Sequence, residues 1–191
     1  MMATTTTLMT ARDLELMPDD GYRYELMRGV LKKMPPTAAP HLIVSGRLIG
    51  YLNQYLEEHD LGDAGGEGRL IFENDPGVVL SPDVAVLFVE QLPELSTSGL
   101  MRVVPPLVAE VISPANRPTA IEEKVRVYLR AGVKLVWVVD TDQRMIRVRT
   151  ADGGDRLLTE RDELPGEDVF PEFRVELRRV FRRMLQFGRK V

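Results

Sequence analysis

The spacing of apolar residues predicts two long helices. From about Pro40 to Glu58, apolar side chains recur mostly every three or four positions, the spacing of one helix face, and Gly62 follows shortly after. The same spacing returns over residues 118–131, and Gly132 comes directly after that segment. The apolar face of this second segment consists of Ile121, Val125, Tyr128 and Leu129. We expect an amphipathic helix over each segment.

Short apolar runs rich in β-branched residues occupy much of the remaining chain, and Pro, Gly and Asp bound them. These runs cover residues 68–72, 77–80, 83–89, 106–113, 134–140 and 144–150. We expect a strand over each, and a hairpin over residues 22–34 that turns at Arg28-Gly29. Helices and strands in this order predict an α/β or α+β fold, in which helices flank a mixed β-sheet.

Three further segments carry weaker signals. Residues 62–68 are glycine-rich, but Arg69-Leu70 follows them where a phosphate-binding loop has Lys-Ser or Lys-Thr, so we expect a plain turn. Residues 89–105 are long for a connection and have room for a turn of helix or for a cover over the site. The threonine-rich residues 1–10 are expected to be a flexible N-terminal segment, and residues 11–191 a single domain.

The composition fits an ordinary globular domain, with 191 residues, 44% hydrophobic and 28% charged. The absence of cysteine excludes disulfides, cysteine-ligated zinc, iron–sulfur clusters and thiol catalysis. Only two histidines, His41 and His59, are present, which argues against a two-histidine metal site. No apolar run of about 18 residues occurs, and the N-terminus lacks a signal-peptide pattern. We therefore expect a cytoplasmic protein with no membrane partner.

Charge is unevenly distributed along the chain. The net charge is −4, yet the C-terminal segment from about residue 171 has seven basic residues against two acidic ones. The favoured interpretation is an amphipathic surface helix with Val180, Met184 and Leu185 inward and the arginines in water. The alternative is a basic segment that contacts phosphate backbones.

Two acidic residues adjoin strands that the pattern predicts to be buried. Asp83 opens the run over residues 83–89, and Glu110 lies inside the run over residues 106–113. A buried carboxylate must be protonated, paired with a cation or bound to a metal, because isolated burial of its charge is too costly. Asp83 has a simple alternative, a turn made by residues 81–83. For Glu110, which lies inside an apolar strand, the alternative is a salt bridge.

Lys124 is the candidate cation, because it shares the apolar face of the second predicted helix with Ile121 and Tyr128. Its aliphatic stem could instead lie over the core with the ammonium in water. Two carboxylates and a lysine also form a chemical set suited to phosphodiester hydrolysis. Carboxylates hold Mg²⁺ or Mn²⁺, the metal lowers the pKa of a bound water, and a lysine neutralises developing charge.

These residues carry a resemblance to known nucleases. Pro82-Asp83 followed by Glu110-Val111-Ile112 resembles the PD-(D/E)XK signature of restriction-endonuclease-like enzymes, with Ile112 where the signature has its lysine. Lys124 resembles the displaced lysine of some branches. More closely, RYELMRG, SPDVAVL, PPLVAEVISPANR, EEKVRVYLRAGVKLVWVVD and RMIRV, in this order over about residues 11–180, resemble the bacterial Uma family.

The resemblance implies a restriction-endonuclease-like core and a specific set of site residues. It implies Asp83 and Glu110 as metal ligands, the carbonyl of Val111 as a further ligand, and Lys124 as the catalytic lysine. Glu25, in RYELMRG, is implied as another acid of the site. His41, at the start of the first long helix, resembles a family position and has a capping or surface role as its alternative. Ser113, Asn116 and Arg117 lie where a loop could reach a phosphate.

The sequence thus leads to three functional hypotheses. The first is a Mg²⁺- or Mn²⁺-dependent nuclease that hydrolyses DNA phosphodiester bonds. The second is an inactive scaffold of the same fold that binds nucleic acid or protein, with the acids and lysine as a buried ion network. The third is a hydrolase of another phosphate ester. For the nuclease, a homodimer that presents two sites to two strands is an expectation.

Overall fold

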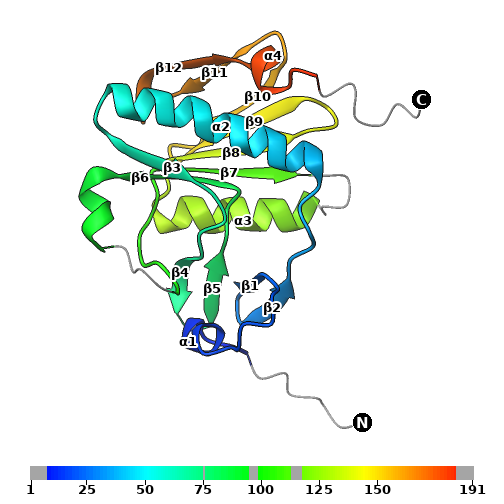
Figure 1. Ribbon diagram of the computed structural model, residues 1–191, viewed down its shortest axis with the longest axis vertical. Helices are drawn as coiled ribbons and strands as arrows, with labels where there is room; N and C mark the ends of the chain where they lie inside the picture. Colours follow the sequence, from blue (N-terminus) through cyan, green and yellow to red (C-terminus); the bar gives the residue numbers. More distant parts are fainter. Residues whose placement is uncertain (1–7, 75, 95–98, 113–117, 184–191) are drawn as a thin grey trace.

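The computed structural model describes residues 8–74, 76–94, 99–112 and 118–183. A six-stranded mixed sheet forms the centre, in the order β10-β9-β8-β7-β6-β3. Its strands are β10 (Asp155–Thr159), β9 (Met145–Thr150), β8 (Leu135–Asp140), β7 (Leu107–Ile112), β6 (Val84–Phe88) and β3 (Gly62–Gly65). Helix α2 (Ala39–Glu58) covers one face of this sheet and α3 (Pro118–Ala131) the other (Figure 1). The predicted mixed sheet flanked by helices is confirmed.

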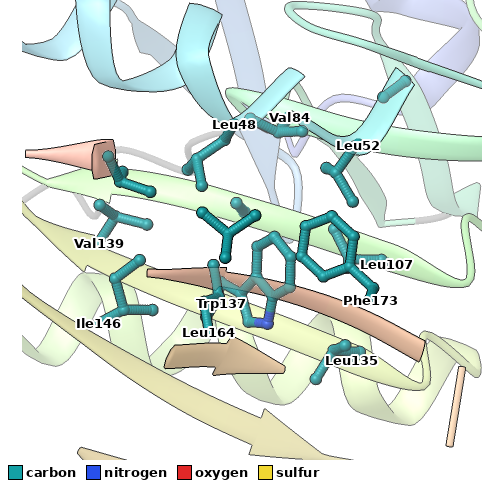
Figure 2. Packing of buried hydrophobic residues seen from close by; sticks show 14 of the residues in the cluster. Leu48, Leu52, Val84, Leu107, Leu135, Trp137, Val139, Ile146, Leu164 and Phe173 are labelled. Atoms are coloured by element: carbon teal, nitrogen blue, oxygen red, sulfur yellow. The ribbon is translucent and has the colours of Figure 1, made fainter. Parts of the chain in front are cut away.

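The core lies on both faces of the central sheet, because neighbouring residues of a strand point to opposite sides. On the α2 face, Leu48 and Leu52 pack with Leu107 and Trp137 in one buried cluster (Figure 2). On the α3 face, residues of β7 and β8 pack with α3: Val108, Val125, Tyr128 and Val136. Alternation along β7 therefore turns Glu110 toward α3.

A second, four-stranded sheet packs below the first in the view of Figure 1, in the order β2-β1-β5-β4. Its strands are β1 (Tyr24–Met27), β2 (Val30–Lys33), β5 (Gly77–Leu80) and β4 (Leu70–Asn74). The predicted hairpin is confirmed, and it turns at Arg28 and Gly29, which have φ angles of 50° and 77°. Two positive φ angles favour a tight two-residue turn whose twist matches that of the strands.

The chain crosses between the two sheets at residues 81–83. β5 ends in the smaller sheet at Leu80, and β6 begins in the central sheet at Val84. β6 then pairs with β7 in antiparallel register, with Val84 opposite Ala109. Extending that register by one residue brings Asp83 opposite Glu110. The crossover thus places an acidic residue where the sheets meet.

Several elements differ from the sequence expectation. Residues 62–68, expected as a plain turn, include β3, which pairs with β6 at the sheet edge. The glycines of this segment are typical of a turn and not of a strand. A Cβ at Gly62 would lie 2.0 Å from the Leu87 carbonyl oxygen, so the close pairing of β3 with β6 requires glycine here. Helix α1 (Ala11–Glu15) and strand β10 were not predicted.

The described part of the basic C-terminal segment, residues 171–183, is mostly not a helix. Strand β12 (Phe170–Glu176) pairs with β11 (Glu163–Gly166) and leads into the short helix α4 (Leu177–Val180). Val180 is buried as expected, while Met184 and Leu185 lie outside the described residues. The alternation of buried Phe173 and Val175 with exposed neighbours explains the strand.

Two remaining segments are the long connection over residues 89–105 and the N-terminus. Residues 89–105 include a turn of 3-10 helix, η1 (Val89–Glu94), and none of their described residues lines the pocket that contains the candidate site. At the other end, Met9 exchanges backbone hydrogen bonds with Gly29 and Gly77, and residues 1–7 lie outside the described residues. Across the described ranges, each helix is too short or too polar to cross a membrane.

Candidate active site

A pocket of about 350 Å³ lies at the junction of the two sheets. Its walls come from the β1–β2 hairpin, the connection that leads to α2, the first turn of α2, the crossover at residues 81–83, the end of β7, and α3. The sequence-predicted residues that line it are Glu25, His41, Asp83, Glu110, Val111 and Lys124. Residues that are distant in the chain therefore meet in one cavity.

Glu110 is the buried centre of this group. Its side chain is 6% exposed, and its carboxylate accepts hydrogen bonds from Lys124 Nζ, which lies 3.2 Å from Oε1 and 3.0 Å from Oε2. The Tyr128 hydroxyl donates a short hydrogen bond to Oε1. Lys124 and Tyr128 lie four residues apart on α3, so one turn of helix presents both side chains to β7.

Lys124 also contacts Glu25, on the neighbouring sheet. Its Nζ lies 2.8 Å from Oε1 of Glu25, which is buried with 1% exposure. The same oxygen accepts the backbone N–H of Ser81 at 3.0 Å. A single ammonium thus joins two buried carboxylates from different sheets, and the hypothesis of a Lys124 stem with its charge in water does not describe this geometry.

Burial and charge together set the ionisation of this group. Burial raises the pKa of Glu110 to about 7, and the carboxylates of Asp83 and Glu25 add to the rise while Lys124 and Tyr128 oppose it. Burial alone would lower the pKa of Lys124, but Glu110 and Glu25 outweigh it and raise this pKa above its ordinary value. Lys124 therefore stays protonated at neutral pH.

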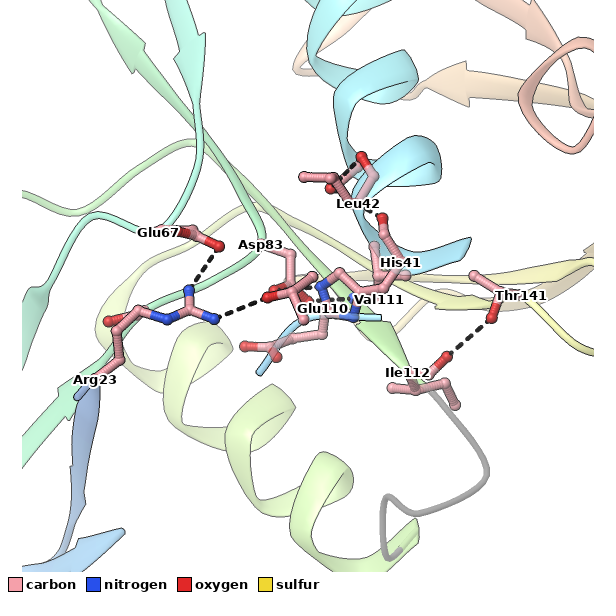
Figure 3. A network of polar contacts seen from close by, with 12 residues as sticks. Arg23, His41, Leu42, Glu67, Asp83, Glu110, Val111, Ile112 and Thr141 are labelled. Atoms are coloured by element: carbon pink, nitrogen blue, oxygen red, sulfur yellow. Dashed lines mark hydrogen bonds and ion pairs between the residues drawn. The ribbon is translucent and has the colours of Figure 1, made fainter. Parts of the chain in front are cut away.

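Asp83 is held from two directions (Figure 3). Its Oδ2 accepts the backbone N–H of Val111 at 2.7 Å, which fixes the crossover against the end of β7. Its Oδ1 lies 2.8 Å from Nε2 of His41, in the first turn of α2. Asp83 thus links α2 to β7 beside Glu110, rather than forming only a local turn.

Some participants were not singled out from the sequence. Tyr128 was assigned to an apolar face, yet its hydroxyl contacts Glu110; its signal is that a buried tyrosine four residues after the inward lysine needs a polar partner. Arg23 pairs with Glu67 at 2.6 Å and donates to Thr37 at 2.9 Å beside the pocket. The loop candidates Ser113, Asn116 and Arg117 lie outside the described residues.

A hard divalent cation prefers oxygen ligands, and the pocket offers carboxylate oxygens. Among the residues that the structure describes, no group of three or more His, Asp or Glu side chains is arranged to hold a metal ion. Three acids, Glu25, Asp83 and Glu110, line the pocket, and Lys124 pairs with two of them. Each carboxylate oxygen has two acceptor sites, so Asp83 and Glu110 retain capacity beyond their present bonds.

The comparisons with known proteins agree with this architecture. Residues 11–178 match the family Uma2, described as "Putative restriction endonuclease". A solved structure described as "a putative nuclease belonging to DUF820", from Anabaena variabilis, superposes with a TM-score of 0.80 at 18% sequence identity. That match covers 91% of this chain and 97% of the other. Among the curated proteins compared, none matches.

The structural likeness, at this low identity, shows a shared fold. The family match shows more, because it extends from α1 to α4 and includes all the pocket acids and Lys124. The chain belongs to the Uma2 family of restriction-endonuclease-like proteins.

Proposed function

We propose that this protein is a Mg²⁺- or Mn²⁺-dependent nuclease that hydrolyses phosphodiester bonds of DNA. The observation that carries the proposal is the sharing of Lys124 between Glu25 and Glu110, in a pocket that Asp83 also lines. A nuclease needs carboxylates for a divalent cation and a cation near the scissile phosphate. Membership of the Uma2 family supports the same activity.

Asp83 and Glu110 would hold the divalent cation, with the carbonyl of Val111 as a further ligand. When bound, the cation polarises a phosphate oxygen and makes water more acidic, and thus more reactive at neutral pH. The hydrogen bond from the Val111 N–H orients the Asp83 carboxylate, and the Tyr128 hydroxyl orients that of Glu110. Both ligands are thereby fixed before substrate arrives, which lowers the cost of ordering them.

Lys124 would serve the phosphate. An ammonium has three N–H donors, and Glu25 and Glu110 engage this one from two sides. The side chain remains 12% exposed, and its three hydrogen bonds go to Glu25 Oε1 and to both carboxylate oxygens of Glu110. A phosphate oxygen or the attacking water would therefore take the place of one of the two bonds to Glu110. Glu25 acts as the positioning residue that keeps the ammonium at the pocket, and its negative charge keeps Lys124 protonated.

The test uses the purified chain with labelled double- and single-stranded DNA, in Mg²⁺, in Mn²⁺ and in EDTA. Variants Asp83→Asn, Glu110→Gln and Lys124→Gln should reduce cleavage by at least about a hundredfold, as expected for loss of groups that act in the transition state. Lys134→Gln, an exposed lysine outside this pocket, is the matched control and should retain wild-type rates.

Three results would contradict the proposal. If the folded wild type cleaves neither form of DNA with either metal, the nuclease assignment fails. If it hydrolyses a small phosphodiester but leaves DNA intact, the activity is that of another phosphate-ester hydrolase. Cleavage that survives unchanged in Glu110→Gln would reveal a contaminating enzyme and equally remove the support.

A further inference from the structure

The pocket has a basic side as well as an acidic floor. Strand β2 is an edge strand of the smaller sheet, and its register with β1 places Lys32 directly opposite Glu25. Directly opposed residues of two paired strands project to the same face of the sheet. Both residues line the pocket, Glu25 in its buried interior and Lys32 on its exposed wall.

Lys32 forms no ion pair with Glu25, the acid opposite it in the sheet. Glu25 directs its Oε1 to Lys124 and to the Ser81 N–H. Within the described part of the chain, the Lys32 ammonium has no ion pair or hydrogen bond. Among the described residues, Lys32 on the exposed wall of the pocket is thus left without a carboxylate partner.

The neighbouring cations are already engaged. Lys33 Nζ lies 2.9 Å from the ring centroid of Tyr22, a cation–π contact. Arg23 pairs with Glu67 and donates to Thr37. Unlike these two nearby basic residues, Lys32 therefore has a charged group that is available to bind an anion.

Three acids line the pocket and repel a polyanionic substrate, and of the four Lys and Arg residues that line it, Lys124 is paired with two of those acids. A cation on the wall offsets that repulsion and gives a backbone phosphate a fixed partner. Nucleic-acid backbones are bound mainly by such lysine and arginine contacts, each of which releases counterions. A solvated lysine that only protects the exposed edge of β2 from pairing is the competing explanation.

We propose that Lys32 binds a backbone phosphate of the nucleic-acid substrate next to the scissile bond and positions the strand over the pocket. This inference rests on the proposed nuclease function and adds to it a residue that contacts substrate outside the hydrolytic group. Because the contact is to the backbone, it acts alike on all base sequences.

The test measures binding of a fluorescein-labelled DNA duplex by anisotropy at several salt concentrations, with Ca²⁺ in place of Mg²⁺. Lys32→Ala should weaken binding by about fivefold or more and lower the slope of log K against log salt by about one. Lys33→Ala removes an equal charge from the adjacent position and should leave both quantities near wild type. Thermal unfolding of the variants checks that each is folded.

The outcomes separate this inference from the proposed function. Equal affinity and slope for wild type and Lys32→Ala, or equal weakening by both lysine variants, overturn the Lys32 contact even if the wild type cleaves DNA. Weakening by Lys32→Ala alone supports the contact even if no cleavage occurs, in which case only hydrolysis fails. A wild type that binds no DNA overturns both.

Discussion

Nζ of Lys124 lies 2.8 Å from Oε1 of Glu25, a residue 99 positions earlier in the chain. The contact joins α3, on the central sheet, to β1 of the smaller sheet. Both side chains are largely buried, with 12% and 1% exposed. The stability of the fold depends strongly on an ion pair in this setting, because a buried charge that loses its partner has no water to solvate it.

Removing one partner of this buried pair should destabilise the protein strongly. We expect Glu25→Ala to lower the free energy of unfolding by about 3–5 kcal/mol, because it leaves Lys124 short of one carboxylate. Urea denaturation measures the change. Asp155→Ala removes the surface partner of Arg147 and should cost at most about 1 kcal/mol. Equal losses in the two variants would contradict the buried pairing.

The Tyr128 hydroxyl should matter beyond its packing. Tyr128→Phe keeps the ring but deletes the donor to Glu110, so it should cost about 1–3 kcal/mol of unfolding free energy. It should also raise the pKa of Glu110 further, since this hydrogen bond lowers it. Carboxyl NMR titration follows the pKa; an unchanged value would show that the hydroxyl does not stabilise the charged carboxylate.

Stability should depend on pH through Glu110. Folding raises its pKa from 4.5 to about 7, so the folded state binds this proton more tightly than the unfolded state. The resulting stabilisation is complete below the unfolded pKa and is lost as pH rises through the folded one. In EDTA, the unfolding free energy of wild type should therefore fall relative to that of Glu110→Gln between pH 4.5 and about 7. Parallel profiles would refute the shift.

A divalent cation should stabilise the wild type and depend on Asp83. Mn²⁺ at about 100 times its Kd should add about 2.7 kcal/mol to the unfolding free energy, and calorimetric titration should show saturable binding. Asp83→Asn should lose both effects, while the exposed Asp142→Asn should keep them. Stabilisation of all three proteins alike would point to nonspecific surface binding of the ion.

Local pattern was enough to predict the elements that build the site. The helix over residues 118–131 was predicted with the bounds that α3 has, because its apolar face is regular and Gly132 follows it. Glu110 stood out because a carboxylate inside an apolar strand needs a partner, and Lys124 stood out because it shares the packed face of that helix. These signals need no knowledge of the tertiary structure.

Other features depend on contacts between distant segments, which local pattern does not encode. β3 is a strand because β6 lies beside it, although its glycines suggest a turn. The polar role of Tyr128 requires an acceptor on β7, and Lys32 lies on the pocket wall only because β2 pairs with β1. Asp83 could be read as a turn residue until the crossover placed it against Val111.

The crossover at residues 81–83 has a consequence for the dynamics of the molecule. The Ser81 N–H donates to Glu25 of the smaller sheet, and Asp83 accepts the Val111 N–H of the central sheet. Lys124 bridges the same boundary. Any fluctuation that detaches the smaller sheet must therefore dismantle the pocket at the same moment, as one cooperative unit. Slow amide exchange in β1 and in β7 would then report a common opening event, and a ligand seated across the boundary would slow both together.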